Sequence, residues 1–93
     1  MNLTTLEKKF LTIMGDGAAE EIGSYKEADL LEDNMSWTFL EDFETDPKIA
    51  RGVIASLVKK DLAGVDDASH DTKILYFLGE DGIKEYCKLK GAA

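Results

Sequence analysis

The chain has 93 residues, of which 44% are hydrophobic and 32% charged, a composition typical of one globular domain spanning residues 1–93. This length excludes two separate cores, and the hydrophobic fraction excludes a disordered chain. Nineteen acidic residues against eleven basic ones give a net charge of −8, which disfavours binding to nucleic acid. The sequence shows neither an apolar run long enough for a membrane span nor a signal peptide, and the single Cys87 excludes an internal disulfide. We therefore expect a cytoplasmic protein that makes no membrane contact.

Acidic and basic residues occupy different parts of the chain. Residues 16–46 contain eleven acids and one base, whereas residues 47–60 contain four bases and no acid. This asymmetry predicts an acidic body with one cationic segment, so the net charge alone does not exclude an anionic partner.

The first predicted helix covers residues 3–14. Thr4 and Glu7 form a candidate capping box at its start, and Gly15-Asp16-Gly17 is expected to end it. Its apolar stripe consists of Leu3, Leu6, Phe10, Ile13 and Met14. An acidic insertion over about 16–34 follows, with a short helix expected over 25–33.

A second short helix is predicted over 37–43, opened by Ser36, with Trp37 and Leu40 pointing inward. After a turn at residues 44–45, a longer helix is predicted over 46–60, with Asp46 as its N-cap and Pro47 at its first position. Asp61 stands at the exit, where a left-handed backbone is usual. The buried face of this helix is expected to comprise Ala50, Val53, Ile54 and Leu57. Its exposed face is expected to comprise Lys48, Arg51, Gly52, Ala55, Ser56 and Lys59.

Two strands are predicted over 62–65 and 73–78, joined by an acidic tip over 66–72. A last helix is expected over 80–89, with Ile83, Tyr86, Cys87 and Leu89 facing inward. One core should unite these elements, comprising Leu6, Phe10, Trp37, Leu40, Ala50, Val53, Ile54, Leu57, Leu62, Ile74, Tyr76 and Ile83.

The segment from Asp46 to Leu62 resembles the winged helix-turn-helix proteins broadly of the MarR kind, including short phage-encoded ones. Pro47, Arg51, Leu57, Lys60 and Leu62 occur in the order found there, and Asp61 replaces the usual glycine. The resemblance implies an α+β, mostly helical fold in which a recognition helix leads into a small antiparallel β-hairpin, the wing. It carries no catalytic motif.

Two functions follow, and both stay open. The resemblance implies a small DNA-binding regulator, monomeric or homodimeric, that contacts DNA through Lys48, Arg51, Ser56, Lys59 and Lys60. The alternative is an acidic interaction module or inhibitor that binds a basic protein surface, and even mimics nucleic acid. An acidic wing of Asp66, Asp67 and Asp71 favours this alternative, because it would repel phosphates.

Catalytic and metal chemistry find little support in the sequence. His70 is the only histidine, and although acids surround it, no cysteine stands at ligand spacing. No phosphate-binding loop, nucleophile elbow or paired C-x-x-C is present. We expect no cofactor and no enzymatic activity.

Overall fold

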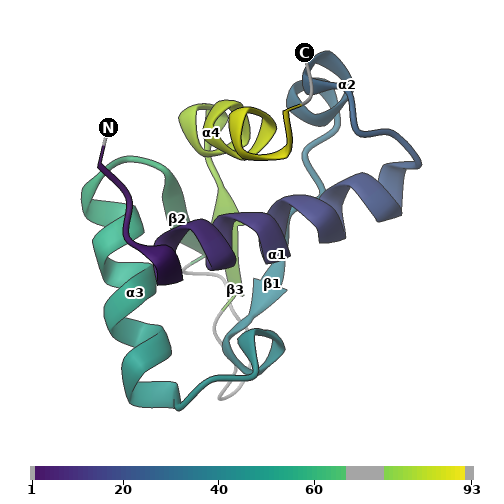
Figure 1. Ribbon diagram of the computed structural model, residues 1–93. Coiled ribbons are helices and arrows are strands. Elements are labelled where there is room, and N and C mark those ends of the chain that lie inside the picture. The colour runs from purple at the N-terminus through teal and green to yellow at the C-terminus, as the bar shows by residue number, and fades with distance from the viewer. Residues whose placement is uncertain (1, 67–74, 92–93) are drawn as a thin grey trace.

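The computed structural model describes residues 2–66 and 75–91, and this part of the chain is α+β and mostly helical (Figure 1). The elements, in chain order, are α1 (Thr5–Ile22), α2 (Glu27–Glu32), β1 (Thr38–Phe39), the 3-10 helix η1 (Leu40–Phe43), α3 (Pro47–Lys59), β2 (Ala63–Asp66), β3 (Leu75–Leu78) and α4 (Glu80–Lys90).

The three described strands form one antiparallel sheet in the order β1-β3-β2. Thr38 and Val65 both lie opposite Tyr76, on either side of it. In Figure 1, α1 crosses in front of the sheet, α3 stands beside it and α4 lies along its upper end. All three helices contact the sheet, and Tyr76 and Leu78 of β3 are buried while Leu75 and Phe77 are only partly so, which identifies the face with Tyr76 and Leu78 as the covered one.

The core lies between this covered face and the helices. The rings of Phe10 and Phe43 stack with centroids 4.1 Å apart, which joins α1 to η1. Seven of the predicted core residues are buried: Phe10, Ala50, Ile54, Leu57, Leu62, Tyr76 and Ile83. Leu40 and Val53 are partly buried against the same cluster. Ile74 lies outside the described residues.

Helix α1 is longer than predicted, because Gly15-Asp16-Gly17 does not end it. The helix continues to Ile22 and terminates at Gly23, whose φ of 74° is left-handed. Gly15 is buried against the Tyr86 ring of α4, which occupies the space that a Cβ would need. This glycine therefore serves close packing of two helices and not a turn.

The prediction of a helix over 37–43 is wrong in its first half. Thr38 and Phe39 form β1, and only residues 40–43 are helical, as a single 3-10 turn. Trp37 is 50% exposed on the face of the sheet that carries Phe77, and the two rings lie 5.5 Å apart. Strand alternation places Trp37 on the opposite face from the buried Thr38, which explains why it is not in the core.

Two further apolar residues were wrongly assigned to the interior. Leu6 is 39% exposed at the start of α1, and Leu89 is 37% exposed in the last turn of α4. The other predictions for α4 are confirmed, since Ile83, Tyr86 and Cys87 are buried. Tyr86 also donates a hydrogen bond of 2.6 Å to Asp16 of α1.

The antiparallel pairing predicted for the hairpin is confirmed for its described residues, with Asp66 of β2 opposite Leu75 of β3. The short acidic helix expected over 25–33 is present as α2, next to α4. Asp66, predicted as the first residue of the tip, is the last residue of β2, whereas residues 67–72 of the tip, with Asp67, His70 and Asp71, lie outside the described residues.

Candidate functional site

Helix α3 begins and ends as the sequence predicts. Asp46 Oδ1 accepts hydrogen bonds from the backbone N–H groups of Lys48, at 2.9 Å, and Ile49, at 3.4 Å. At the other end, Asp61 adopts a left-handed φ of 61°, and the Leu62 N–H donates to the Leu57 carbonyl at 3.0 Å. Both ends of the helix are therefore fixed by local hydrogen bonds.

The outward face of α3 carries three exposed cations, which we call the basic stripe: Lys48, Arg51 and Lys59. Spacings of three and eight residues place their side chains on one side of the helix. Gly52 and Ala55 lie beside them and are also exposed, so this face combines positive charge with small side chains. The buried residues Ala50, Ile54 and Leu57 hold the opposite face against the core.

Two of the predicted DNA contacts are directed elsewhere. Lys60 Nζ lies 2.8 Å from both carboxylate oxygens of Glu7, and it also donates to the Asn2 carbonyl. Ser56 Oγ donates to Glu7 Oε2 at 2.7 Å. Both side chains thus join α3 to the start of α1, and they are separate from the basic stripe.

Glu7 is the one buried acid of this site, with a residue exposure of 1%. Its Oε1 also accepts a hydrogen bond from the Thr4 N–H, which completes the predicted capping box of α1. Burial by itself would raise the pKa of Glu7, but the hydrogen bonds from Lys60, Ser56 and Thr4 outweigh it and lower the pKa to about 2. Glu7 is therefore a buried carboxylate, ionised at neutral pH.

An open groove of about 470 Å³ lies between the start of α1 and α3. We call it the α1–α3 groove, and its lining consists of Thr4, Thr5, Leu6, Glu7, Ile49, Gly52, Val53 and Ser56. Ile49 is 52% exposed and Leu6 39%, so the groove presents apolar side chains next to the basic stripe. The sequence held a signal for Ile49, because its position falls outside the buried stripe of α3.

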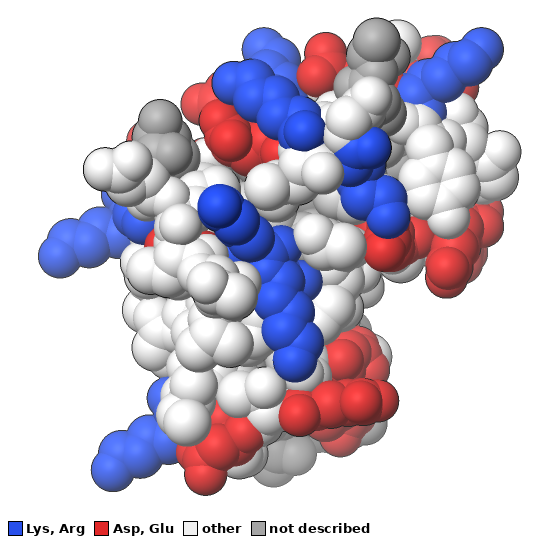
Figure 2. Space-filling model, viewed as in Figure 1, with Lys and Arg blue, Asp and Glu red and all other residues white. Residues whose placement is uncertain are grey.

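Acidic residues surround the start of α3. Glu41, Asp42, Glu44 and Asp46 are all exposed there, and Figure 2 shows acidic side chains gathered at the lower edge of the molecule. Two of these carboxylates act within the fold, since Asp46 caps α3 and Asp42 accepts a hydrogen bond from the Phe39 N–H at 2.9 Å. On the face drawn in Figure 2, basic side chains form separate groups and no continuous strip.

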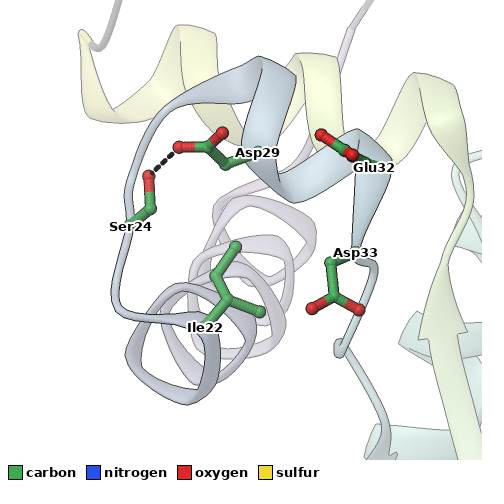
Figure 3. A pocket seen from close by; sticks show the side chains of 5 residues that line it. All are labelled: Ile22, Ser24, Asp29, Glu32 and Asp33. Carbon is green, nitrogen blue, oxygen red and sulfur yellow. Dashed lines mark hydrogen bonds between the residues drawn. The ribbon is translucent and has the colours of Figure 1, made fainter.

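A second pocket lies between the end of α1 and α2 (Figure 3). Asp29, Glu32 and Asp33 line it together with Ile22 and Ser24, and Ser24 Oγ donates to Asp29 at 2.6 Å. Within residues 2–66 and 75–91, none of these three carboxylates pairs with a lysine or arginine. The pocket is therefore strongly acidic.

The described residues hold no group of three His, Cys, Asp or Glu side chains placed to bind a metal ion. Asp66 of the predicted acidic wing is in β2 and half-buried, whereas Asp67 and Asp71 lie outside the described residues. None of the helices in the described part combines the length and the apolar character that a membrane crossing requires.

Comparisons with known proteins found no match to a family model, to a curated protein or to a solved structure. The resemblance to winged helix-turn-helix proteins therefore stays a prediction, and the functional inference depends on the geometry of α3 and its surroundings.

Proposed function

We propose that the protein is a small DNA-binding regulator of the winged-helix type, with α3 as the recognition helix. The observation that carries this proposal is the outward face of α3, where Lys48, Arg51 and Lys59 flank the exposed Gly52. A helix with this profile fits a major groove, since lysine and arginine contact phosphates and base edges while glycine permits close approach.

The arrangement of elements supports the same proposal. A helix, a short strand, a helical turn, α3 and a two-stranded hairpin follow one another, and the sheet order is β1-β3-β2. This order is compatible with a winged helix. Because η1 is only one 3-10 turn, the proposed helix-turn-helix would be a short one.

The charge distribution limits how tightly one copy of the chain would bind. The basic stripe supplies three cations, whereas the whole chain has a net charge of −8. Each phosphate neutralised contributes about 0.9 to the salt dependence, so one copy should show a slope near −3 in a plot of log affinity against log salt. Homodimers binding two adjacent half-sites would double this slope.

Fluorescence anisotropy with a labelled duplex of random sequence tests the proposal at low salt. Binding that is weakened when Arg51 is replaced by alanine supports α3 as the contact surface. An unchanged anisotropy at the highest soluble protein concentration would contradict it.

The acidic pocket between α1 and α2 favours a second candidate function, binding to a basic protein surface. Asp29, Glu32 and Asp33 have no cationic partner among the described residues, so a basic partner would gain three charge pairs. A Glu32→Lys, Asp33→Lys double variant should abolish such a complex and leave DNA binding by α3 in place. Both candidate functions consist of binding without catalysis.

A further inference from the structure

The α1–α3 groove offers apolar surface where the proposed DNA contact would occur. Ile49 of α3 is 52% exposed and Leu6 of α1 is 39% exposed, and both line this groove. Neither side chain is among the buried residues that stabilise the core. Their exposure at the edge of the basic stripe is therefore not explained by the fold.

Gly52 adjoins both the groove and the basic stripe. It lines the groove, and an added Cβ would meet no other atom within 4 Å. A glycine inside a helix makes the helix less stable than an alanine would, and no contact of Gly52 compensates for this cost. An added Cβ at Gly17 of α1 would also meet nothing within 4 Å, so free space alone does not distinguish Gly52. What distinguishes Gly52 is its position between apolar and cationic side chains.

The charge next to the groove defines the kind of partner that fits it. Lys48 and Lys59 lie four and seven residues from Gly52 and on its side of α3, so a ligand of the groove should bring negative charge to this edge. Duplex DNA does this while also exposing an apolar group, because each thymine places its C5 methyl group in the major groove.

We propose, on the basis of the proposed DNA-binding function, that the α1–α3 groove receives thymine methyl groups and so gives the protein a preference for thymine-containing sites. Ile49 and Leu6 contact the methyl groups, Gly52 lets the helix backbone approach the base edges, and the basic stripe binds the phosphates. Specificity then comes from apolar contact, and most of the affinity from charge.

The test compares two duplexes that differ only in the methyl group: alternating dA and dT, and the same duplex with dU in place of every dT. Wild-type protein should bind the thymine duplex about fourfold more tightly for each methyl group removed from water. Competition with an acidic, leucine-containing peptide on the same samples tests the other occupant of the groove.

Variants separate a methyl contact from a general effect of uracil on duplex shape. Ile49→Ala should abolish the preference for thymine while retaining binding to the uracil duplex, since the exposed side chain is not needed for folding. Arg51→Ala should weaken binding to both duplexes equally. Leu89→Ala, which removes a similarly exposed leucine from α4, is the matched control and should change neither value.

Four outcomes would overturn the inference. Equal affinity of the wild type for both duplexes, or an unchanged preference in Ile49→Ala, would remove the groove from recognition while leaving DNA binding by α3 intact. If the acidic peptide binds tightly to the groove but displaces neither duplex, the groove belongs to a protein partner. Absence of binding to either duplex would overturn the inference together with the proposed function.

Discussion

Lys60 is the C-terminal cap of α3, and its Nζ lies 2.8 Å from both carboxylate oxygens of Glu7 in α1. The Glu7 side chain is 2% exposed and that of Lys60 is 31% exposed, so one partner is buried and the other reaches solvent. This contact fixes the end of the proposed recognition helix against α1, and Glu7 also lines the α1–α3 groove.

Removal of Lys60 should therefore destabilise the protein. Lys60→Ala leaves the buried Glu7 carboxylate without its cation, and we expect a loss of about 1–3 kcal/mol in the free energy of unfolding. Lys84→Ala is the matched control, because Lys84 pairs with Glu80 across an exposed i,i+4 contact. Urea denaturation should show a clear loss for the first variant and almost none for the second; equal losses would contradict the account.

The same ion pair predicts a dependence of stability on pH. The pKa of Glu7 is lowered from 4.5 to about 2 in the folded protein. Because the folded state favours the ionised carboxylate, this stabilisation is present above pH 4.5 and is lost as the pH falls toward 2. Its full size is roughly 3 kcal/mol. Thermal melts of Glu7→Gln should show a weaker decline of stability over this interval than wild type, and identical profiles would contradict the shift.

Four glycines should respond in opposite ways to replacement by alanine. Gly17 and Gly52 lie in helices with nothing within 4 Å of an added Cβ, so alanine should stabilise the fold by about 0.5–1 kcal/mol at each. Gly15 meets the Tyr86 ring and Gly82 meets the Leu62 backbone carbonyl, so alanine should destabilise at both. Only Gly52→Ala should also weaken DNA binding. Stabilisation at Gly15 would contradict the close packing of α1 and α4.

Trp37 should report on the face of the sheet that carries Phe77. It is the only tryptophan of the chain and is half-exposed beside Phe77, so an external quencher should reach it readily. Trp37→Ala should cost much less stability than Leu57→Ala, which removes a fully buried side chain and should cost about 2–5 kcal/mol. A strongly shielded tryptophan would mean that another surface covers this face.

The sequence predicts most helices of the fold because local signals determine them. The capping box of Thr4 and Glu7, the Asp46-Pro47 start of α3 and the left-handed Asp61 were all confirmed. Gly15 misled the prediction because a glycine needed for contact with Tyr86 has the same appearance in sequence as one that ends a helix. The short strand β1 was missed because its pairing with β3 is a long-range interaction.

For the candidate site, the sequence identified the basic stripe and missed its surroundings. Lys48, Arg51 and Lys59 are exposed as expected from helical spacing. That Lys60 and Ser56 turn toward Glu7 depends on where α1 crosses α3, which no local pattern encodes. The burial of Glu7 could have been predicted, because it precedes Phe10 and Leu11 by three and four residues and therefore lies on the buried face of α1.

The central claim is that the basic stripe of α3 binds DNA, and a salt titration of two triple variants tests it most directly. One variant replaces Lys48, Arg51 and Lys59 with alanine, and the other replaces Lys84, Lys88 and Lys90 of α4, so both lose three positive charges. We predict that wild type and the α4 variant bind duplex DNA at low salt with a slope near −3 per chain, and that the α3 variant does not bind. Equal weakening of both variants, or binding that survives in the α3 variant, would contradict the claim.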